Sequence, residues 1–433
     1  MIVFIKKQLR SLFQVILIFL YIYGPVFRPI GSWFDLIFFI SIIVIIIDFT
    51  FNKIQSPRYF NKFIILIPLH LYLLLSIGTV AEADYTDYIR FLLKPIRIII
   101  TLYAGFILVK YFHRLYGNKF STKLFFLIFL SICIHALIMA YQLFNPEFKD
   151  WVYFYTATDE FRSSFDYNFR MGGFSGGSGG AVLSVTQSIG IILMPFILRN
   201  KKKWEKIIII VGSVIIFYSI LISGRSGIYP VLLLFPFSVI YASGSINLLS
   251  VIRGFISIFI IIILFSLIFV LYDKYVVIKS PIYYALSRSL DTFLEFRSDG
   301  SFDDQTIEIL KSQILLPSNL STWIFGNGEH LVLTQYHRTL NSDIGFIRNL
   351  WGMGLFGAFI YIYPLLSTSI IVFRKREKYR FAGLFLLISV VMIAYDFKEN
   401  FLYVRMLWSI YSLVLFILYF DRKYYYNNTK IYR

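Results

Sequence analysis

Three cationic side chains recur at helical spacing where one apolar segment begins. Arg90, Lys94 and Arg97 are four and three residues apart, so a helix would present all three on one face. Arg97 would lie about 10 Å further along that helix than Arg90. An isolated cation in lipid costs about 2.5–3.5 kcal/mol even on permissive scales, which predicts that this stripe faces protein, water or an anion. Snorkelling toward lipid headgroups is the alternative, and it suits Arg90 better than Arg97.

Two further segments combine arginine with glycine, a pairing suited to anions. Arg162 and Arg170 precede a glycine-rich run at 172–180 that contains Gly173, and Arg225 lies in a Ser-Gly-Arg-Ser-Gly turn. Glycine lets backbone N–H groups approach a phosphate closely, and a guanidinium can donate two parallel hydrogen bonds to its oxygens. The run lacks the Gly-Lys-Ser/Thr end of a Walker loop. We interpret both segments as anion-binding, against the alternatives of a flexible tether and an ordinary turn.

The end of a second polar stretch carries groups that could accept protons. His337, Arg338 and Asp343 precede a long apolar segment, and Arg348 lies near its beginning. Histidine and aspartate are ordinary general bases, so His337 and Asp343 are candidate catalytic residues and Arg338 and Arg348 candidate ligand-binding residues. A polar cap over a helix end, with Ser342 or Asp343 as the N-cap, is the alternative. There is no Asp-x-Asp pair and no cluster with metal-ligand spacing, so the sequence predicts neither a metal nor another cofactor.

The composition requires a membrane environment for these groups. The 433 residues are 58% hydrophobic and 20% aromatic, and the mean hydropathy is +0.72. Apolar runs of about 18 or more residues can cross a hydrocarbon layer as helices, and continuous runs such as 42–47 exclude the alternation of a barrel. The net charge of +18 gathers in short clusters beside these runs, which favours cytoplasmic anchoring and argues against nucleic acid. The expected fold is therefore an all-α protein with many transmembrane helices.

Twelve spans account for the apolar segments. We place them at 12–27, 31–50, 63–80, 91–112, 124–144, 181–198, 207–223, 228–246, 252–272, 345–373, 381–397 and 400–420. Basic connections alternate with less basic ones, which predicts cytoplasmic termini in a single integral domain, 1–433, of the cytoplasmic membrane. The connection at 247–253 supports this topology least, because it offers only Arg253.

The same count makes two polar stretches the third and fifth outer loops, at 145–180 and 273–344. Within the fifth loop the pattern predicts short helices at 281–297 and from Ser301 to about Leu315. His70 and His135 lie inside spans, and we expect them to be hydrogen-bonded packing residues.

These features together resemble the O-antigen polymerases, integral membrane proteins that polymerise lipid-linked sugar repeat units, and the related capsule polymerases and O-antigen ligases. Arg162 with Gly173 matches an arginine-ten residues-glycine pattern of the family's third outer loop. The turn around Arg225 is similar to the family's serine-arginine turn. The glycines at 326–328 and 345–357 look like the glycine-punctuated end of its fifth loop.

The chain departs from the family pattern in two places. No arginine of the fifth loop has a glycine eleven positions later. The histidine-asparagine pair typical of the ligases is absent, because Arg338 follows His337, and this favours a polymerase.

The resemblance implies metal-independent glycosyl transfer at the outer face of the membrane, between glycans carried on polyprenyl pyrophosphate. Membrane lipid and a chain-length-determining copolymerase are the partners that it implies. Cations must stabilise the departing pyrophosphate, and we assign this role to Arg97, Arg162, Arg170 and Arg225, with Lys94 as helper. Four loop aromatics could stack on sugar rings or anchor at the interface: Trp151, Tyr153, Phe154 and Tyr155. A flippase for the same lipid-linked oligosaccharide and an O-antigen ligase are the alternative functions.

Overall fold

The described part of the chain is helical throughout its long elements. The computed structural model describes residues 2–27, 35–51, 61–78, 85–157, 162–163, 170–175, 180–199, 201–243, 248–257, 259, 263, 311–328, 342, 344–399 and 402–431. The helices are α1 (Ile2–Tyr23), α2 (Leu36–Phe51), α3 (Asn61–Ile64), α4 (Leu66–Gly78), α5 (Tyr85–Tyr116), α6 (Phe120–Phe144), α7 (Pro146–Thr156), α9 (Gly180–Leu198), α10 (Lys203–Ser223), α11 (Ile228–Ala242), α15 (Leu320–Phe325), α16 (Gly345–Arg374), α17 (Ala382–Asp396) and α18 (Arg405–Ile431). The all-α expectation is confirmed for these residues. The helix expected at 281–297 and most of 301–315 lie outside them.

Four helical segments are long and apolar enough to cross a membrane. They are Leu93–Phe144, Gly180–Leu198, Lys203–Ser223 and Gly345–Arg374. The first contains two antiparallel helices, because the 3-10 turn η2 (Gly117–Lys119) separates α5 from α6. Shorter apolar helices accompany them, including Leu36–Thr50 and Ala382–Asp396. The chain is therefore membrane-embedded, and the count of twelve spans stays a prediction.

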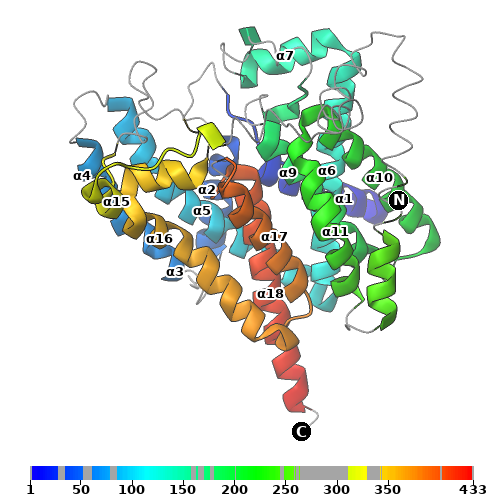
Figure 1. Ribbon diagram of the computed structural model, residues 1–433. Coiled ribbons are helices and arrows are strands. Elements are labelled where there is room, and N and C mark those ends of the chain that lie inside the picture. Colours follow the sequence, from blue (N-terminus) through cyan, green and yellow to red (C-terminus); the bar gives the residue numbers. More distant parts are fainter. Residues whose placement is uncertain are drawn as a thin grey trace.

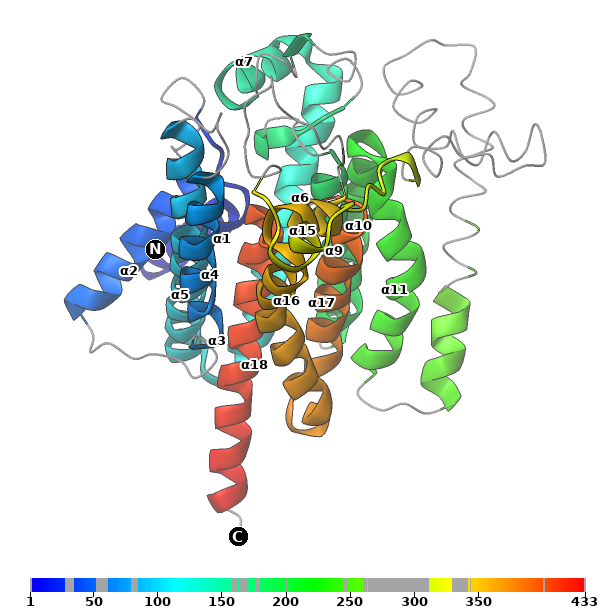
Figure 2. The ribbon, with the colours of Figure 1, turned by 60° about the vertical axis from the view of Figure 1, so that its left-hand side comes forward.

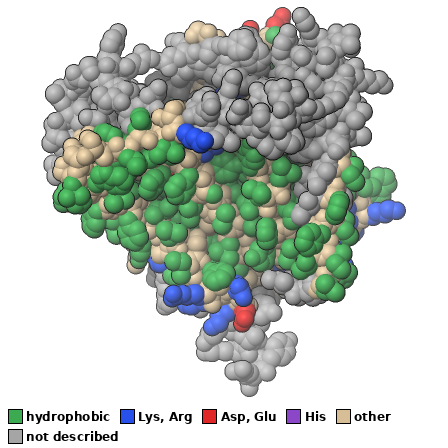
Figure 3. Space-filling model, viewed as in Figure 1, with side chains coloured by type: hydrophobic (Ala, Val, Ile, Leu, Met, Phe, Trp, Pro, Cys, Tyr) green, Lys and Arg blue, Asp and Glu red, His purple; other side chains and the backbone are tan. Residues whose placement is uncertain are grey.

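The surface of the bundle carries the apolar belt that lipid contact requires. Hydrophobic side chains cover the middle of the face in Figure 3, and Lys and Arg side chains gather near its lower edge. On α16, Leu355, Phe356, Phe359 and Ile370 are all strongly exposed. Large exposed apolar side chains at this density belong to a lipid-facing surface rather than to a water-facing one.

The two ends of the bundle differ. Helices α7 and α15 lie at one end, which we call the loop end, and the C-terminal part of α18 projects from the opposite end (Figure 1). Helix α18 starts at Arg405 near the loop end and runs beside α5 (Figure 2). Residues at the first turns of α2 and α18 therefore lie toward the loop end.

Two ion pairs fix the register of α2 against α5. Arg97 binds Asp35 at 3.6 Å, and Lys110 binds Asp48 at 3.2 Å. Both pairs join residues 62 positions apart, so the two helices run parallel with one constant offset. Lys110 and Asp48 are buried, and a buried charge left without its partner is strongly destabilising. A slip of one helix past the other would break both pairs at once.

Helix α16 is two helices joined at Gly354. The expected span 345–373 is one apolar run, but the backbone at Gly354 has φ of 65°, which interrupts the helical path. The turn after α15 contacts this point: Gly326 has φ of 74°, and a Cβ on either glycine would overlap backbone of the other segment. The Asn327 N–H donates to the Trp351 carbonyl at 2.8 Å across the same contact. Residues 345–353 thus form a separate short helix at the loop end.

Gly354→Ala should lower stability for two reasons that can be separated. Alanine at positive φ costs about 1–3 kcal/mol, and its methyl group would also overlap the Ile324 carbonyl. Gly117→Ala is the matched control, because Gly117 also has positive φ (49°) but has nothing within 4 Å of an added Cβ. Thermal unfolding of purified protein in detergent should show a larger loss for Gly354→Ala. Equal losses would contradict the contact between α15 and α16.

Candidate functional site

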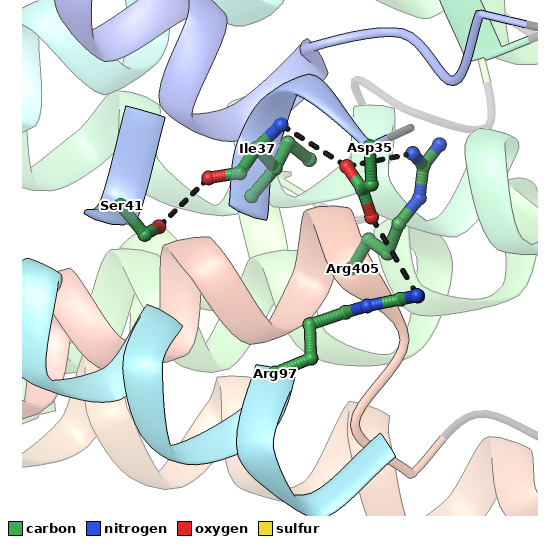
Figure 4. Close-up of polar contacts among 5 residues, drawn as sticks. All are labelled: Asp35, Ile37, Ser41, Arg97 and Arg405. Atoms are coloured by element: carbon green, nitrogen blue, oxygen red, sulfur yellow. Dashed lines mark hydrogen bonds and ion pairs between the residues drawn. The ribbon is translucent and has the colours of Figure 1, made fainter. Parts of the chain in front are cut away.

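A buried carboxylate between two arginines is the strongest polar feature of the described residues. Asp35 precedes α2 as its N-cap, and its Oδ1 accepts the Ile37 N–H at 3.0 Å. Arg405 donates to the same oxygen at 3.2 Å from the start of α18, while Arg97 of α5 approaches Oδ2 at 3.6 Å (Figure 4). The Asp35 side chain is 1% exposed, whereas Arg97 is 35% and Arg405 21% exposed. Three helices therefore bring their charges to one point.

The charges at this point do not cancel. Two guanidiniums share one carboxylate, so the group of Asp35, Arg97 and Arg405 carries a net charge of +1. Both arginines keep part of their surface open, so a second anion could be bound by their remaining donors. We call these three residues the arginine pair site. Of the surroundings expected for the stripe (protein, water or an anion), the structure shows protein beside Arg97, in the form of the Asp35 carboxylate.

Lys94 lies one helical turn from Arg97 and faces a different neighbour. Its Nζ lies 5.2 Å from the centre of the Tyr361 ring, a cation–π contact with α16. Tyr361 is buried, and its carbonyl accepts the Tyr403 hydroxyl at 2.8 Å. His70 lies 6.0 Å from the same ring and binds the Leu66 carbonyl through Nδ1 at 2.7 Å. The expectation that His70 is a hydrogen-bonded packing residue is confirmed.

The turn that contains Arg225 is held from two sides. It forms the 3-10 helix η5 (Arg225–Gly227), and the Gly227 N–H donates to Ser184 Oγ of α9 at 3.0 Å. From the other side, Lys398 Nζ donates to Ser226 Oγ at 2.6 Å, and the Tyr395 hydroxyl donates to the Ser226 carbonyl. The turn is thus fixed between α9 and the end of α17. The Arg225 side chain lies outside the described residues.

Arg170, a cation of the third loop, lies near the Arg225 turn. A Cβ on Gly180 would lie 3.3 Å from Arg170 Nη1 and 2.7 Å from the Ser223 carbonyl oxygen. Arg170 therefore lies where α9 begins and α10 ends. Arg162 lies elsewhere, with its guanidinium carbon 5.6 Å from the centre of the Phe154 ring of α7.

Gly173 docks the third loop instead of offering its N–H to an anion. Its N–H donates to Gln142 Oε1 at 2.9 Å, and the Phe174 N–H donates to His135 Nε2 at 3.2 Å. The Met171 and Gly172 N–H groups also bind protein acceptors, the Ile222 carbonyl and the Tyr153 hydroxyl. This part of the glycine-rich run therefore has its donors engaged within the protein, contrary to the anion-binding interpretation, while residues 176–179 lie outside the described residues.

His135 is the point to which the loop is attached. The ring is buried in α6, stacks on Tyr23 at 4.0 Å, and has the Gln187 side-chain amide 2.9 Å from Nδ1. The expectation of a hydrogen-bonded packing histidine is confirmed. Both ring nitrogens are engaged, which fixes the ring against α1, α9 and the loop.

The remaining expected site residues are placed only in part. Arg348 donates through Nε to the Ser342 carbonyl, which ties it to the start of α16. Arg90 lies in α5, but its side chain is outside the described residues, as are all atoms of His337, Arg338 and Asp343. Within the described residues, no group of three His, Cys, Asp or Glu side chains could hold a metal ion.

Three residues of this region are not among the site residues predicted from the sequence. Asp35, Lys398 and Arg405 lie at helix ends and follow no spacing pattern. Asp35 and Arg405 are ionisable residues next to apolar segments, which by default mark functional positions in membrane proteins. That rule could have selected both, but it could not have joined them, since they are 370 positions apart in the chain.

Comparison of the chain with protein-family models, with curated proteins and with solved structures gives no match. The fold and the site define a class only: a membrane-embedded, all-α protein with a cationic polar cluster toward its loop end.

Gly173→Ala should loosen the third loop, because the added methyl group would overlap the His135 ring. Trypsin should then cleave after Arg170 faster than in the wild type, with the rest of the digestion pattern preserved. Unchanged cleavage would show that the contact with His135 does not hold the loop.

Asp35→Asn should destabilise the protein, because it leaves two arginines without their counter-charge. Arg97→Gln removes one of these cations, so the double variant should lose less stability than the sum of the single variants, with an interaction energy of about 0.5–3 kcal/mol. Equilibrium unfolding in mixed detergent micelles measures all four proteins. Additive losses would mean that the two charges are not coupled.

Proposed function

We propose that this protein is a membrane glycosyltransferase that polymerises polyprenyl-pyrophosphate-linked oligosaccharide repeat units. In this proposal the loop end is the outer face of the cytoplasmic membrane, and both termini are cytoplasmic. The repeat units on their lipid carriers are the substrates, and a chain-length-determining copolymerase is a partner. The reaction uses neither metal nor cofactor.

The observation that carries the proposal is the arginine pair site. A departing pyrophosphate gains negative charge as its bond to the sugar breaks, and fixed cations stabilise that charge most effectively where water is scarce. Asp35 holds Arg97 and Arg405 at one point without neutralising them, and both guanidiniums remain partly exposed. Preorganised cations of this kind need not reorganise during the reaction.

A second cationic group lies within reach of the first. Lys398 binds the Arg225 turn and Arg405 binds Asp35, and these two cations are seven positions apart along the chain. Their Cα atoms are therefore at most about 25 Å apart. A pyrophosphate with its attached glycan is long enough to contact both cationic groups. In this arrangement the arginine pair site binds the phosphates, and Arg170 and Arg225 bind the adjoining part of the substrate.

The chemistry divides the residues into roles. An acceptor hydroxyl oxygen forms a bond to the anomeric carbon of the donor, and the bond from that carbon to the pyrophosphate oxygen breaks, with its electron pair going to the leaving group. Arg97 and Arg405 stabilise that group, and Lys94 assists them. The hydroxyl proton passes to His337 or Asp343, or to the pyrophosphate itself.

Arg97→Gln should lower polymerisation by about 10²–10³-fold, the usual loss when a donor to a developing anion is removed. The assay uses purified protein in proteoliposomes with lipid-linked repeat units and resolves the product ladder by gel electrophoresis. Arg253→Gln is the matched control, because this exposed arginine lies in the helix at 248–257, outside both cationic groups. Arg225→Ala should also abolish the ladder while the protein is still produced.

Other outcomes identify the alternatives. A ladder formed by purified wild-type protein rules out a flippase or a non-enzymatic scaffold. Movement of single repeat units across the bilayer without a ladder would support the flippase. Continued formation of long lipid-linked polymer in a deletion strain would support the ligase and end the polymerase proposal.

A further inference from the structure

We propose that the exposed face of α7 is a carbohydrate-binding platform that holds the glycan outside the membrane. The inference rests on the proposed function, since it concerns how the same substrate is bound. Its evidence is separate from the cationic groups, because it depends on the aromatic rings of one helix and on where that helix lies.

Helix α7 is part of the third loop and forms an outer layer over its later segment, residues 170–175. Its buried face carries Val152 and Tyr153, and the Tyr153 hydroxyl donates to the Arg170 carbonyl at 3.1 Å. The loop segment beneath it is itself docked on His135 and Gln142. Helix α7 therefore lies on the outer side of the loop segment that is docked on the bundle. Figure 1 shows α7 beyond the ends of the neighbouring helices.

The opposite face presents a row of rings. Trp151 is 59% exposed, Phe154 is 54% exposed and Tyr155 lies beside them, while the half-buried Phe148 at the end of the row also packs against the buried cluster of Val152 and Tyr153. Their ring centres follow each other at 6.1 Å from Phe148 to Trp151, 5.7 Å from Trp151 to Tyr155 and 5.0 Å from Tyr155 to Phe154. Three- and four-residue spacing on a helix places Phe148, Trp151 and Tyr155 along one side, and Phe154 is the neighbour of Tyr155 in the chain.

The charges of this face argue against membrane anchoring. Interfacial helices are rich in lysine and arginine on their polar side, but the only basic residue of α7, Lys149, is buried. Burial lowers its pKa, although the neighbouring Asp150 carboxylate raises it. The exposed charged residues are Glu147 and Asp150, which an anionic lipid surface would repel. Figure 3 likewise shows acidic side chains at the top of the molecule, away from the apolar belt.

Rings and carboxylates together fit a sugar. The C–H groups on one face of a pyranose pack against an aromatic ring, whose π face is negative, and carboxylate oxygens accept hydrogen bonds from hydroxyl groups. Arg162 lies over Phe154 at 5.6 Å, at the edge of the row. The exposed rings of Trp151, Phe154 and Tyr155 thus offer several apolar contacts to a sugar chain.

The test measures oligosaccharide binding by the purified full-length protein. The probes are short oligosaccharides released by mild acid from the polysaccharide of the source cells, and binding is followed by isothermal titration calorimetry. Trp151→Ala should weaken binding by about tenfold, and Trp151→Phe should restore most of it because a ring remains. Trp204→Ala is the matched control, since Trp204 is a 77% exposed tryptophan at the other end of the bundle.

The membrane alternative is tested by fluorescence in nanodiscs. If α7 stays out of the bilayer, brominated lipid removes the same absolute amount of tryptophan fluorescence from wild type and from Trp151→Phe. Extra quenching in the wild type would place Trp151 in lipid and overturn the platform. Unaltered oligosaccharide binding by Trp151→Ala would also overturn it, even with polymerisation intact. If wild-type protein forms no polymer but binds oligosaccharide through Trp151, the proposed polymerase activity falls and the platform stands.

Discussion

The described structure depends on placing charge inside an apolar bundle without leaving it unpaired. Asp35, which precedes α2, and Asp48 within α2 are both buried, and each is matched by a cation of α5 at the same offset along the chain. Removing a charged side chain from water costs several kcal/mol, and only close, well-placed partners offset that cost. Such pairs contribute little net stability, but they exclude other registers. The outer pair then gains a second arginine from α18.

The contact between α15 and α16 completes the same end of the bundle by a different physical means. Here two glycine backbones approach so closely that no side chain fits between them. The resulting break at Gly354 frees residues 345–353 from the direction of the span, and Asn349 can then donate to Asp396 of α17 at 3.4 Å. Asp396 also accepts the Leu402 N–H at 3.3 Å, which shapes the connection that carries Lys398 and leads to Arg405. Loop glycines and buried charges thus position the same segment.

Local features of this fold could be predicted from the sequence, and features formed by distant segments could not. Apolar runs of spanning length indicate helices wherever they occur, and four-and-three spacing indicates that Lys94 and Arg97 share a side of α5. The two histidines were assigned to packing because they lie inside apolar runs, and their hydrogen bonds agree. No spacing relates Asp35 to Arg405, or Ser226 to Lys398, because only tertiary packing joins them. The run that contains Gly354 holds several glycines, and the sequence alone does not show which of them interrupts the helix.

The role of Gly173 shows why a motif does not by itself define a site. Glycine next to arginine suits an anion, but the same small residue also suits close packing on an aromatic ring, and here the His135 ring takes the space. In the proposed reaction, positive charge for the leaving group must then come from side chains rather than from backbone N–H groups of 171–174. Arginines can supply it only if something holds them in place without consuming their charge. One carboxylate shared by two guanidiniums meets both conditions, since it orients each cation and leaves a positive excess for the anion that forms.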